Sequence, residues 1–286
     1  MSALLRHRAR RAAVLGSVLA IVCGGLVGVG AGPAAAADPP GKVLTDAPAT
    51  LPPALADLAT ARRISYASTN VTGAGVTVTG LVLTPTGTRV NRTVVWGHGT
   101  TGLADQCAPS DHLGVFWAEA QAAIAELLSR GWTVTAPDYQ GLGTPEAHPY
   151  LVGGSEARAM IDSVKAARLL DGTLSNQYVV DGHSQGGQAA LFAGELAPSY
   201  DGPLSLRGVA AIAPASNVDL LAPLIPGTPG QGYLVMALYG VAAVDPSFKP
   251  ANVLAAPAEA KNGTASSSVP CTSSTGALGA VWTGFS

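Results

Sequence analysis

The sequence carries little charge for its length. Of its 286 residues, 12% are Asp, Glu, Lys or Arg, whereas 48% are hydrophobic. This composition excludes an intrinsically disordered chain, which combines high charge with low hydrophobicity. Residues 1–37 hold four of the 16 basic residues and none of the 18 acidic ones, so the rest of the chain has 12 basic residues against 18 acidic, a formal charge of −6. We therefore expect no nucleic-acid partner.

The N-terminal segment lacks acidic residues altogether, and no charged residue falls between Ala12 and Ala37. It begins with several arginines and ends in the alanine run 34–37. A basic start, an apolar stretch and small residues before a cleavage point are typical of a secretory signal peptide. We expect residues 1–37 to be a signal peptide cleaved after Ala37, and residues 38–286 to form one secreted, extracellular domain. A retained membrane anchor is the alternative, which the weakly hydrophobic Gly- and Ala-rich stretch disfavours.

Cysteine is also scarce. After residue 37 the chain contains only Cys107 and Cys271. Neither has a second cysteine or histidine at the spacing of a zinc site, so we expect no bound metal. An even number of cysteines in a chain directed to an oxidising compartment favours one disulfide, with two free thiols as the alternative.

Histidine is absent after residue 183, and this absence bears on the most informative motif of the chain. Gly182-His183-Ser184-Gln185-Gly186 follows the β-rich run 178–180 and precedes a helix-forming stretch. The two glycines permit a sharp strand-to-helix bend that would expose Ser184 as a nucleophile, whereas a glycine turn around a buried serine is the structural alternative. Proteins built this way place an Asp or Glu and then a His after the serine, so the base that should activate Ser184 is missing.

Hydrophobic periodicity predicts the elements around this motif. Asp38 to Leu55, with five prolines, is expected to be an extended lead-in without regular structure. Strands and helices should then alternate in a mostly parallel sheet with flanking helices, the α/β class. The predicted strands are 64–68, 76–83, 93–96, 132–136, 178–181 and a buried strand at 208–213; the predicted helices are 117–130, 155–171 and 188–196, the last ended by Pro198.

The pattern changes beyond Pro214. Residues 214–250 are expected to form a partial helical cap, in which the apolar stretch 233–244 is a helix that covers an apolar substrate; a buried core helix is the alternative. Residues 262–286 are a low-complexity tail rich in Ser, Thr and Gly. Nothing in this tail predicts the two strands that would close the sheet, so we expect those strands to be missing.

Attack of a serine on a carbonyl needs two N–H groups to hold the developing oxyanion. The residue after the nucleophile, Gln185, should donate one. The second should come from the loop 98–101, where the backbone N–H of Thr100 is the first choice and Thr101 the second. Three histidines are expected to support the site rather than to act as its base. His183 should pack beneath the turn, His98 should brace the oxyanion loop, and His148 should lie on a surface segment near the mouth of the site.

Several segments together resemble the secretory lipase family of α/β-hydrolases. They are Gly97-His98-Gly99-Thr100-Thr101-Gly102, Asp105-Gln106-Cys107-Ala108-Pro109-Ser110, Asp138-Tyr139-Gln140-Gly141-Leu142-Gly143-Thr144, His148-Pro149-Tyr150-Leu151 and the Ser184 motif. The resemblance spans approximately residues 51–250. It implies a serine lipase or esterase without metal or organic cofactor, a lipid or small ester as substrate, and contact with lipid surfaces. It also implies Ser184 as nucleophile, the 98–101 loop as oxyanion hole and a bridge between Cys107 and Cys271.

Members of that family continue into strands that carry an Asp and then a His, and these two triad members have no matching positions here. The first hypothesis is therefore a secreted triacylglycerol lipase or carboxylesterase that has lost its C-terminal part through truncation or a frameshift, with poor activity of this chain. The second is a non-catalytic binding protein that holds lipid in the former acyl pocket. The third is another serine acyl enzyme on the same fold, such as a peptidase or an acyltransferase.

Overall fold

A computed structural model describes residues 38–112, 118–228, 230–254 and 271. The expected signal peptide, residues 1–37, and nearly all of the low-complexity tail, residues 262–286, lie outside these residues. Among the residues described, no helix combines the length and apolar character that crossing a membrane requires.

Seven strands form one mixed sheet in the order β1-β2-β3-β5-β4-β6-β7. Strands β4 to β7 are mutually parallel, whereas β1, β2 and β3 join the sheet through antiparallel pairs. The strands are β1 Val43–Ala49, β2 Ala59–Thr69, β3 Gly75–Pro85, β4 Thr93–Gly97, β5 Thr133–Pro137, β6 Gln177–His183 and β7 Ser205–Ile212. This arrangement confirms the predicted α/β fold with its mostly parallel sheet.

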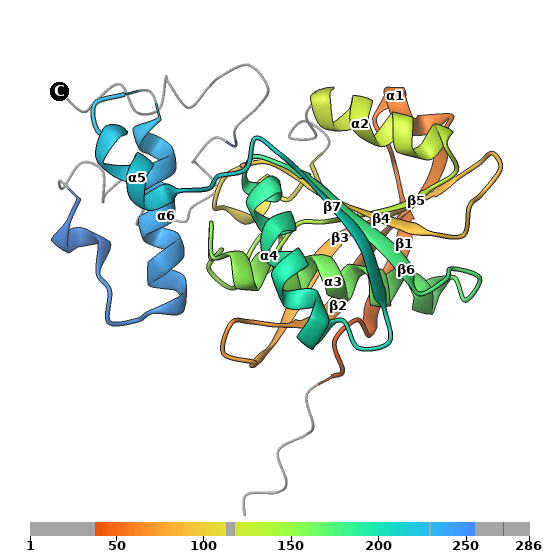
Figure 1. Cartoon of the computed structure of the whole chain (residues 1–286), viewed down its shortest axis with the longest axis horizontal. Helices are drawn as coiled ribbons and strands as arrows, with labels where there is room; N and C mark the ends of the chain where they lie inside the picture. The colour runs from red at the N-terminus through yellow and green to blue at the C-terminus, as the bar shows by residue number, and fades with distance from the viewer. Residues whose placement is uncertain (1–37, 113–117, 229, 255–270, 272–286) are drawn as a thin grey trace, which may run out of the picture. The chain divides into compact units, whose positions relative to one another are not determined.

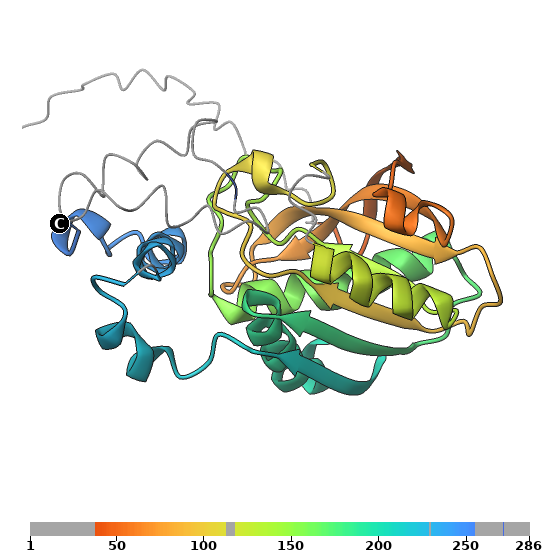
Figure 2. The ribbon, with the colours of Figure 1, turned by 90° about the horizontal axis from the view of Figure 1, so that it is seen from above.

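Helices cover both faces of the sheet. One face packs against α3 and α4, and the other against α1 and α2 (Figure 1). The helices are α1 Pro53–Ala56, α2 Ala118–Ser129, α3 Gly153–Leu170, α4 Gln185–Tyr200, α5 Val218–Leu221 and α6 Gln231–Val244, with short 3-10 turns at Asp105–Cys107, Ala222–Leu224 and Pro250–Asn252. Figures 1 and 2 both show α5 and α6 to one side of the sheet rather than over its faces.

The core consists of two apolar layers. Tyr66, Val95, Tyr178 and Val180 face α3 and α4, where Met160 and Ile161 are fully buried. On the other face, Trp96 and Val134 pack against Ile124 and Leu128 of α2. The predicted helices 117–130 and 155–171 are thereby confirmed, because their apolar residues form the stripes that these layers require.

Three sequence predictions about the elements were wrong. The stretch predicted as an irregular lead-in contains β1, which pairs antiparallel with β2; its side chains are largely exposed, so hydrophobic alternation did not reveal it. Helix α4 continues past Pro198 to Tyr200, because a proline two residues before the helix end removes a single backbone hydrogen bond. Strand β7 was predicted to be buried, but Val209 and Ile212 are 40% and 48% exposed.

Candidate active site

Ser184 occupies the turn between β6 and α4, as the motif predicts. Its φ of 57° and ψ of −116° lie outside the regions that L-residues usually adopt, a strain of the kind that concentrates at functional sites. The backbone on both sides holds it there: Ser184 N donates to Ile212 O at 2.9 Å, and Ala215 N donates to Ser184 O at 3.2 Å. The residue is partly exposed, so the turn lies at the surface rather than in the core.

The glycines of the motif are required by close packing. A Cβ on Gly182 would lie 2.2 Å from Gly186 O, and a Cβ on Gly186 would lie 2.0 Å from Gly97 O. A Cβ on Gly187 would lie 2.9 Å from Ile212 O. Three backbone segments thus meet at the turn, and each meeting point leaves no room for a side chain.

The register of the sheet brings the 98–102 loop beside this turn. Parallel strands β4 and β6 align Trp96 with Asp181 and Gly97 with Gly182. Since both strands end at the same edge of the sheet, the residues that follow Gly97 lie next to those that follow Gly182. Thr100 and Thr101, the two predicted donors of this loop, are each 2% exposed.

Gln185 is the first residue of α4, and the first N–H groups of an α-helix have no acceptor inside the helix. The positive end of the helix dipole also favours negative charge at this point. The Gln185 side chain is buried and turns away into the protein, where its amide donates to Glu156 Oε1 at 2.7 Å and contacts His148 Nε2 at 3.0 Å. Its backbone N–H is thus at the turn while its side chain serves as an anchor.

One histidine, His148, lies elsewhere than predicted. His148 was expected on a surface segment, but it is 3% exposed. Its Nδ1–H donates to Gln140 O at 2.7 Å, its Nε2 accepts from Gln185, and burial lowers its pKa to about 4. The prediction failed because a histidine between alanine and proline has a surface composition, while the hydrogen bonds that compensate its burial come from distant residues.

His98 lies in the predicted loop and is also buried. Its Nδ1 is 2.7 Å from Gly99 O, its Nε2 is 3.2 Å from Asp138 O, and burial lowers its pKa. His183, at the end of β6, is half-buried. His112 is exposed and 3.9 Å from Asp111. Among the residues that the structure describes, no hydrogen bond joins an imidazole to the Ser184 hydroxyl.

Two buried carboxyl groups near the site, those of Glu156 and Asp138, were not among the predicted site residues. Glu156 is fully buried in the first turn of α3, and burial raises its pKa to about 8 against the effect of hydrogen bonds from Gln185 and Leu151. Asp138 follows β5, and burial raises its pKa although it accepts hydrogen bonds from Ser110 and Thr79. The signal for Asp138 was its place in one of the segments that resemble the secretory lipase family, and the signal for Glu156 was a charged residue within the predicted helix 155–171.

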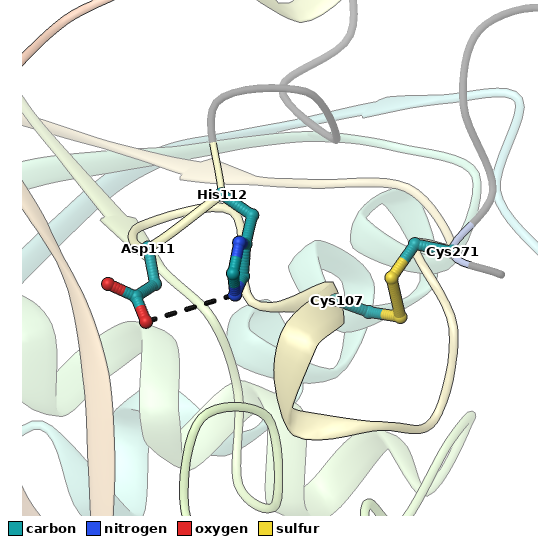
Figure 3. Close-up of a disulfide and its surroundings, with 4 residues drawn as sticks. All are labelled: Cys107, Asp111, His112 and Cys271. Carbon is teal, nitrogen blue, oxygen red and sulfur yellow. Dashed lines mark ion pairs between the residues drawn. A yellow bond between two sulfur atoms is a disulfide. The ribbon is translucent and has the colours of Figure 1, made fainter. Parts of the chain in front are cut away.

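A disulfide joins Cys107 to Cys271 across a sequence separation of 164 residues, with their Cα atoms 5.3 Å apart (Figure 3). Cys107 ends the 3-10 turn at 105–107 and packs in a small buried cluster with Ala104, Ala108 and Leu142. The bond thus fixes Cys271 close to the loop that follows β5. Within the described part of the chain, no three His, Cys, Asp or Glu side chains are grouped as they would be around a metal ion.

Structural comparison supports the fold. Lipase A from Candida antarctica in its closed state superposes with a TM-score of 0.66 at 18% identity, covering 79% of this chain and 54% of that one. A hydrolase from Legionella pneumophila gives a TM-score of 0.64 at 21% identity, covering 78% and 67%. At these identities the likeness establishes the α/β-hydrolase fold alone.

Sequence comparison establishes the family. A secreted triacylglycerol lipase of Malassezia globosa is 31% identical over 220 residues, which are 72% of this chain and 46% of that relative. Lipase 5 of Candida albicans is 33% identical over 157 residues, 50% of this chain and 33% of the relative. The chain therefore spans about half or less of the length of these two relatives. The secretory lipase family model matches residues 107–275, which are more than half of the chain. The chain therefore belongs to the secretory lipase family.

Proposed function

We propose that this protein is a secreted carboxylic ester hydrolase acting on lipid esters such as triacylglycerols, with Ser184 as its nucleophile. One observation carries the proposal: Ser184 occupies a strained turn between a strand and the N-terminus of α4, beside the loop that follows β4. The names of two similar proteins of Malassezia globosa, both secreted triacylglycerol lipases, support both the substrate class and the extracellular location.

In the proposed reaction, the Ser184 oxygen attacks the ester carbonyl carbon and gives up its proton to a base. The backbone N–H groups of Gln185 and Thr100 stabilise the resulting oxyanion, each by about 3 kcal/mol. Collapse of this intermediate expels the alcohol, which takes up a proton, and leaves an acyl-enzyme. Water then releases the carboxylic acid and restores the serine.

The base is the critical point. None of the described imidazoles bonds to the Ser184 hydroxyl, so we expect the proton to go to solvent or to an added base and the turnover of this chain to be slow. Removal of a triad member leaves a remnant of catalysis from substrate binding and the oxyanion hole, and that remnant is the expected activity.

Hydrolysis of p-nitrophenyl butyrate by the purified chain tests the proposal, with and without imidazole as an external base. We expect slow turnover that rises with imidazole concentration in the wild type and does not rise above background in Ser184→Ala. Equal rates for the two proteins would contradict the proposal. Turnover at the rate of ordinary lipases without imidazole would confirm Ser184 chemistry but contradict the expectation of poor activity.

The lack of a hydrogen bond between any described imidazole and Ser184 also favours a second candidate, a protein that binds lipid without cleaving it. Fatty acid that co-purifies with the chain, together with no labelling of Ser184 by a fluorophosphonate, would favour this function over hydrolysis. A serine peptidase or acyltransferase would instead label at Ser184 and show its preference in a comparison of ester, amide and alcohol-acceptor substrates.

A further inference from the structure

We propose that the loop 138–151, which follows β5, positions both donors of the oxyanion hole. His148 holds the side chain of Gln185, and Tyr150 holds the side chain of Thr100. This inference rests on the proposed function, which supplies the roles of Gln185 and Thr100. His148 and Tyr150 themselves do not contact substrate in the proposal, so they are positioning residues.

The loop is fixed tightly enough to act in this way. Tyr139 and Leu151, near its two ends, have positive φ values of 75° and 59°, which persist only where the surroundings impose them. Gly141 has a φ of +76°, and a Cβ there would lie 2.5 Å from both Ala147 C and His148 N. The loop thus folds back on itself between residues 141 and 148.

The Gln185 side chain is held through its amide nitrogen, whereas its Oε1 is buried without a hydrogen-bond partner among the described residues. Its Nε2 is 3.0 Å from His148 Nε2 and donates to Glu156 Oε1 at 2.7 Å, so both amide hydrogens have acceptors. Glu156 Oε1 also accepts from Leu151 N at 3.1 Å. The same carboxyl group therefore holds the end of the loop and the anchor of the first donor. A side chain held at two points restricts the backbone to which it belongs.

Tyr150, two residues after His148, makes the contact with the second donor, Thr100. The Tyr150 hydroxyl and Thr100 Oγ1 share a hydrogen bond of 2.7 Å, and both residues are buried. Helix α6 closes over this point, because a Cβ on Gly240 would lie 2.1 Å from Tyr150 O. Tyr150 is thereby confined between the oxyanion loop and α6.

A third contact joins the loop 138–151 to His98, the first residue of the loop 98–101. The Tyr139 hydroxyl donates to His98 O at 3.1 Å, and the two rings lie 4.4 Å apart between centroids. Tyr139 and His148 stack with centroids 6.2 Å apart. One loop thus contacts both strand ends that border the site, and a shift of the loop would move the two donors together.

The experiment compares Tyr150→Phe with Tyr200→Phe in the full chain. Both substitutions remove one hydroxyl, but Tyr200 bonds to Asp162 and Thr69, outside the loop. The probe is an alkyl p-nitrophenyl phosphonate, which phosphonylates the serine and releases nitrophenol, with imidazole as base. We expect Tyr150→Phe to lower the limiting rate of labelling about tenfold and to leave the half-saturating concentration within about twofold. Tyr200→Phe should lower Tm and leave the limiting rate unchanged.

A wild-type limiting rate in Tyr150→Phe would overturn the inference, as would a slower reaction caused by weaker probe binding alone. A second measurement does not depend on reactivity: the backbone amide signals of Thr100 and Gln185 in chain labelled with ¹⁵N-threonine and ¹⁵N-glutamine. We expect both signals to move in Tyr150→Phe and neither to move in Tyr200→Phe; movement of Thr100 alone would overturn shared positioning. If wild type and Ser184→Ala show the same absence of labelling, the proposed function fails, and the amide signals still decide the role of the loop.

Discussion

Strands β6 and β7 are parallel neighbours of similar length, yet their surroundings differ sharply. Tyr178 and Val180 of β6 are buried, and the turn after β6 packs backbone against backbone at distances that admit only glycine. In β7, Val209 and Ile212 are largely exposed, and a Cβ on Gly208 would find its nearest neighbour at 3.9 Å. The candidate site therefore lies at a turn whose backbone contacts leave no room for side chains, whereas Gly208 in the neighbouring strand has open space around it.

The same contrast extends beyond the two strands. The loop 138–151 and Glu156 bind the turn at residues 182–187, hereafter the elbow, through buried hydrogen bonds, whereas α5 and the turn that follows it expose Leu220 and Leu224 at 67% and 72%. An oxyanion hole works only if its donors are fixed before the reaction begins. The difference shows that buried hydrogen bonds hold the residues around Ser184, whereas the segment at α5 carries exposed apolar side chains.

A pair of glycine substitutions tests the contrast most severely. Gly186→Ala should lower the free energy of unfolding by about 3 kcal/mol or more, because its Cβ would meet backbone atoms that cannot move aside. Gly208→Ala should stay within about 1 kcal/mol of wild type, since the position is open. Urea unfolding of both variants measures the difference, and equal destabilisation would remove the distinction between the two strands.

The pH dependence of stability tests the buried carboxyl group beside the elbow. The pKa of Glu156 is raised to about 8 in the folded state. The contribution of this group to the free energy of unfolding is therefore complete below its unfolded pKa and is lost as pH rises toward 8. His148, with a lowered pKa, has the opposite effect only below about pH 6.5. Raising the pH from 6.5 to 8 should therefore lower the free energy of unfolding by about 2 kcal/mol through Glu156.

Urea unfolding of wild type and Glu156→Gln at the two pH values measures this slope. The glutamine variant should show a flatter profile, since it has no proton to lose. Glu195→Gln, an exposed change on α4, is the matched control and should keep the wild-type slope. Identical slopes in all three proteins would contradict a protonated carboxyl group beneath the elbow.

A smaller effect is expected at the buried contact between β2 and α3. Ser68 Oγ donates to Asp162 Oδ2 at 2.7 Å, and both residues are buried. Ser68→Ala should cost about 1.5 kcal/mol because the carboxylate loses one of its donors. Ser199→Ala, which removes an exposed hydroxyl on α4, should change stability by less than about 0.5 kcal/mol. Thermal unfolding of the two variants is sufficient, and a cost at Ser199 equal to that at Ser68 would contradict the expectation.

The smallest effect belongs to the exposed leucines. Leu224→Ser should leave the free energy of unfolding within about 0.5 kcal/mol of wild type, because the side chain has little packing to lose. Solubility should rise, since the substitution reduces exposed apolar surface. A loss of more than about 1 kcal/mol in urea unfolding would mean that this segment is packed as firmly as the elbow.

Local sterics explain what the sequence predicted well. The turn at Ser184 and the alternation of strands and helices follow from glycine positions and hydrophobic period, which act over a few residues. Burial of β7 could not be predicted, because an apolar strand reads the same at the centre of a sheet and at its edge. The cap role of residues 214–250 stays a prediction, although α6 forms within them.

The network around Gln185 was beyond sequence reasoning for a different reason. His148 and Tyr150 belong to the loop after β5 and Glu156 belongs to α3, and these residues acquire their roles only when the loop folds against α3, α4 and the loop that holds Thr100. The sequence identified His148 and Tyr150 as part of one motif but gave no means to decide what they touch. In general, a sequence does not show which distant residues a buried polar side chain will bond to.

The bond between Cys107 and Cys271 turns the intervening segment into a covalent ring that contains Ser184 and α6. One proteolytic cut at any exposed point between these two cysteines would leave the fragments attached to each other. Such nicked protein would migrate as two bands in electrophoresis only after reduction. A preparation judged intact without a reducing agent could therefore already be cleaved.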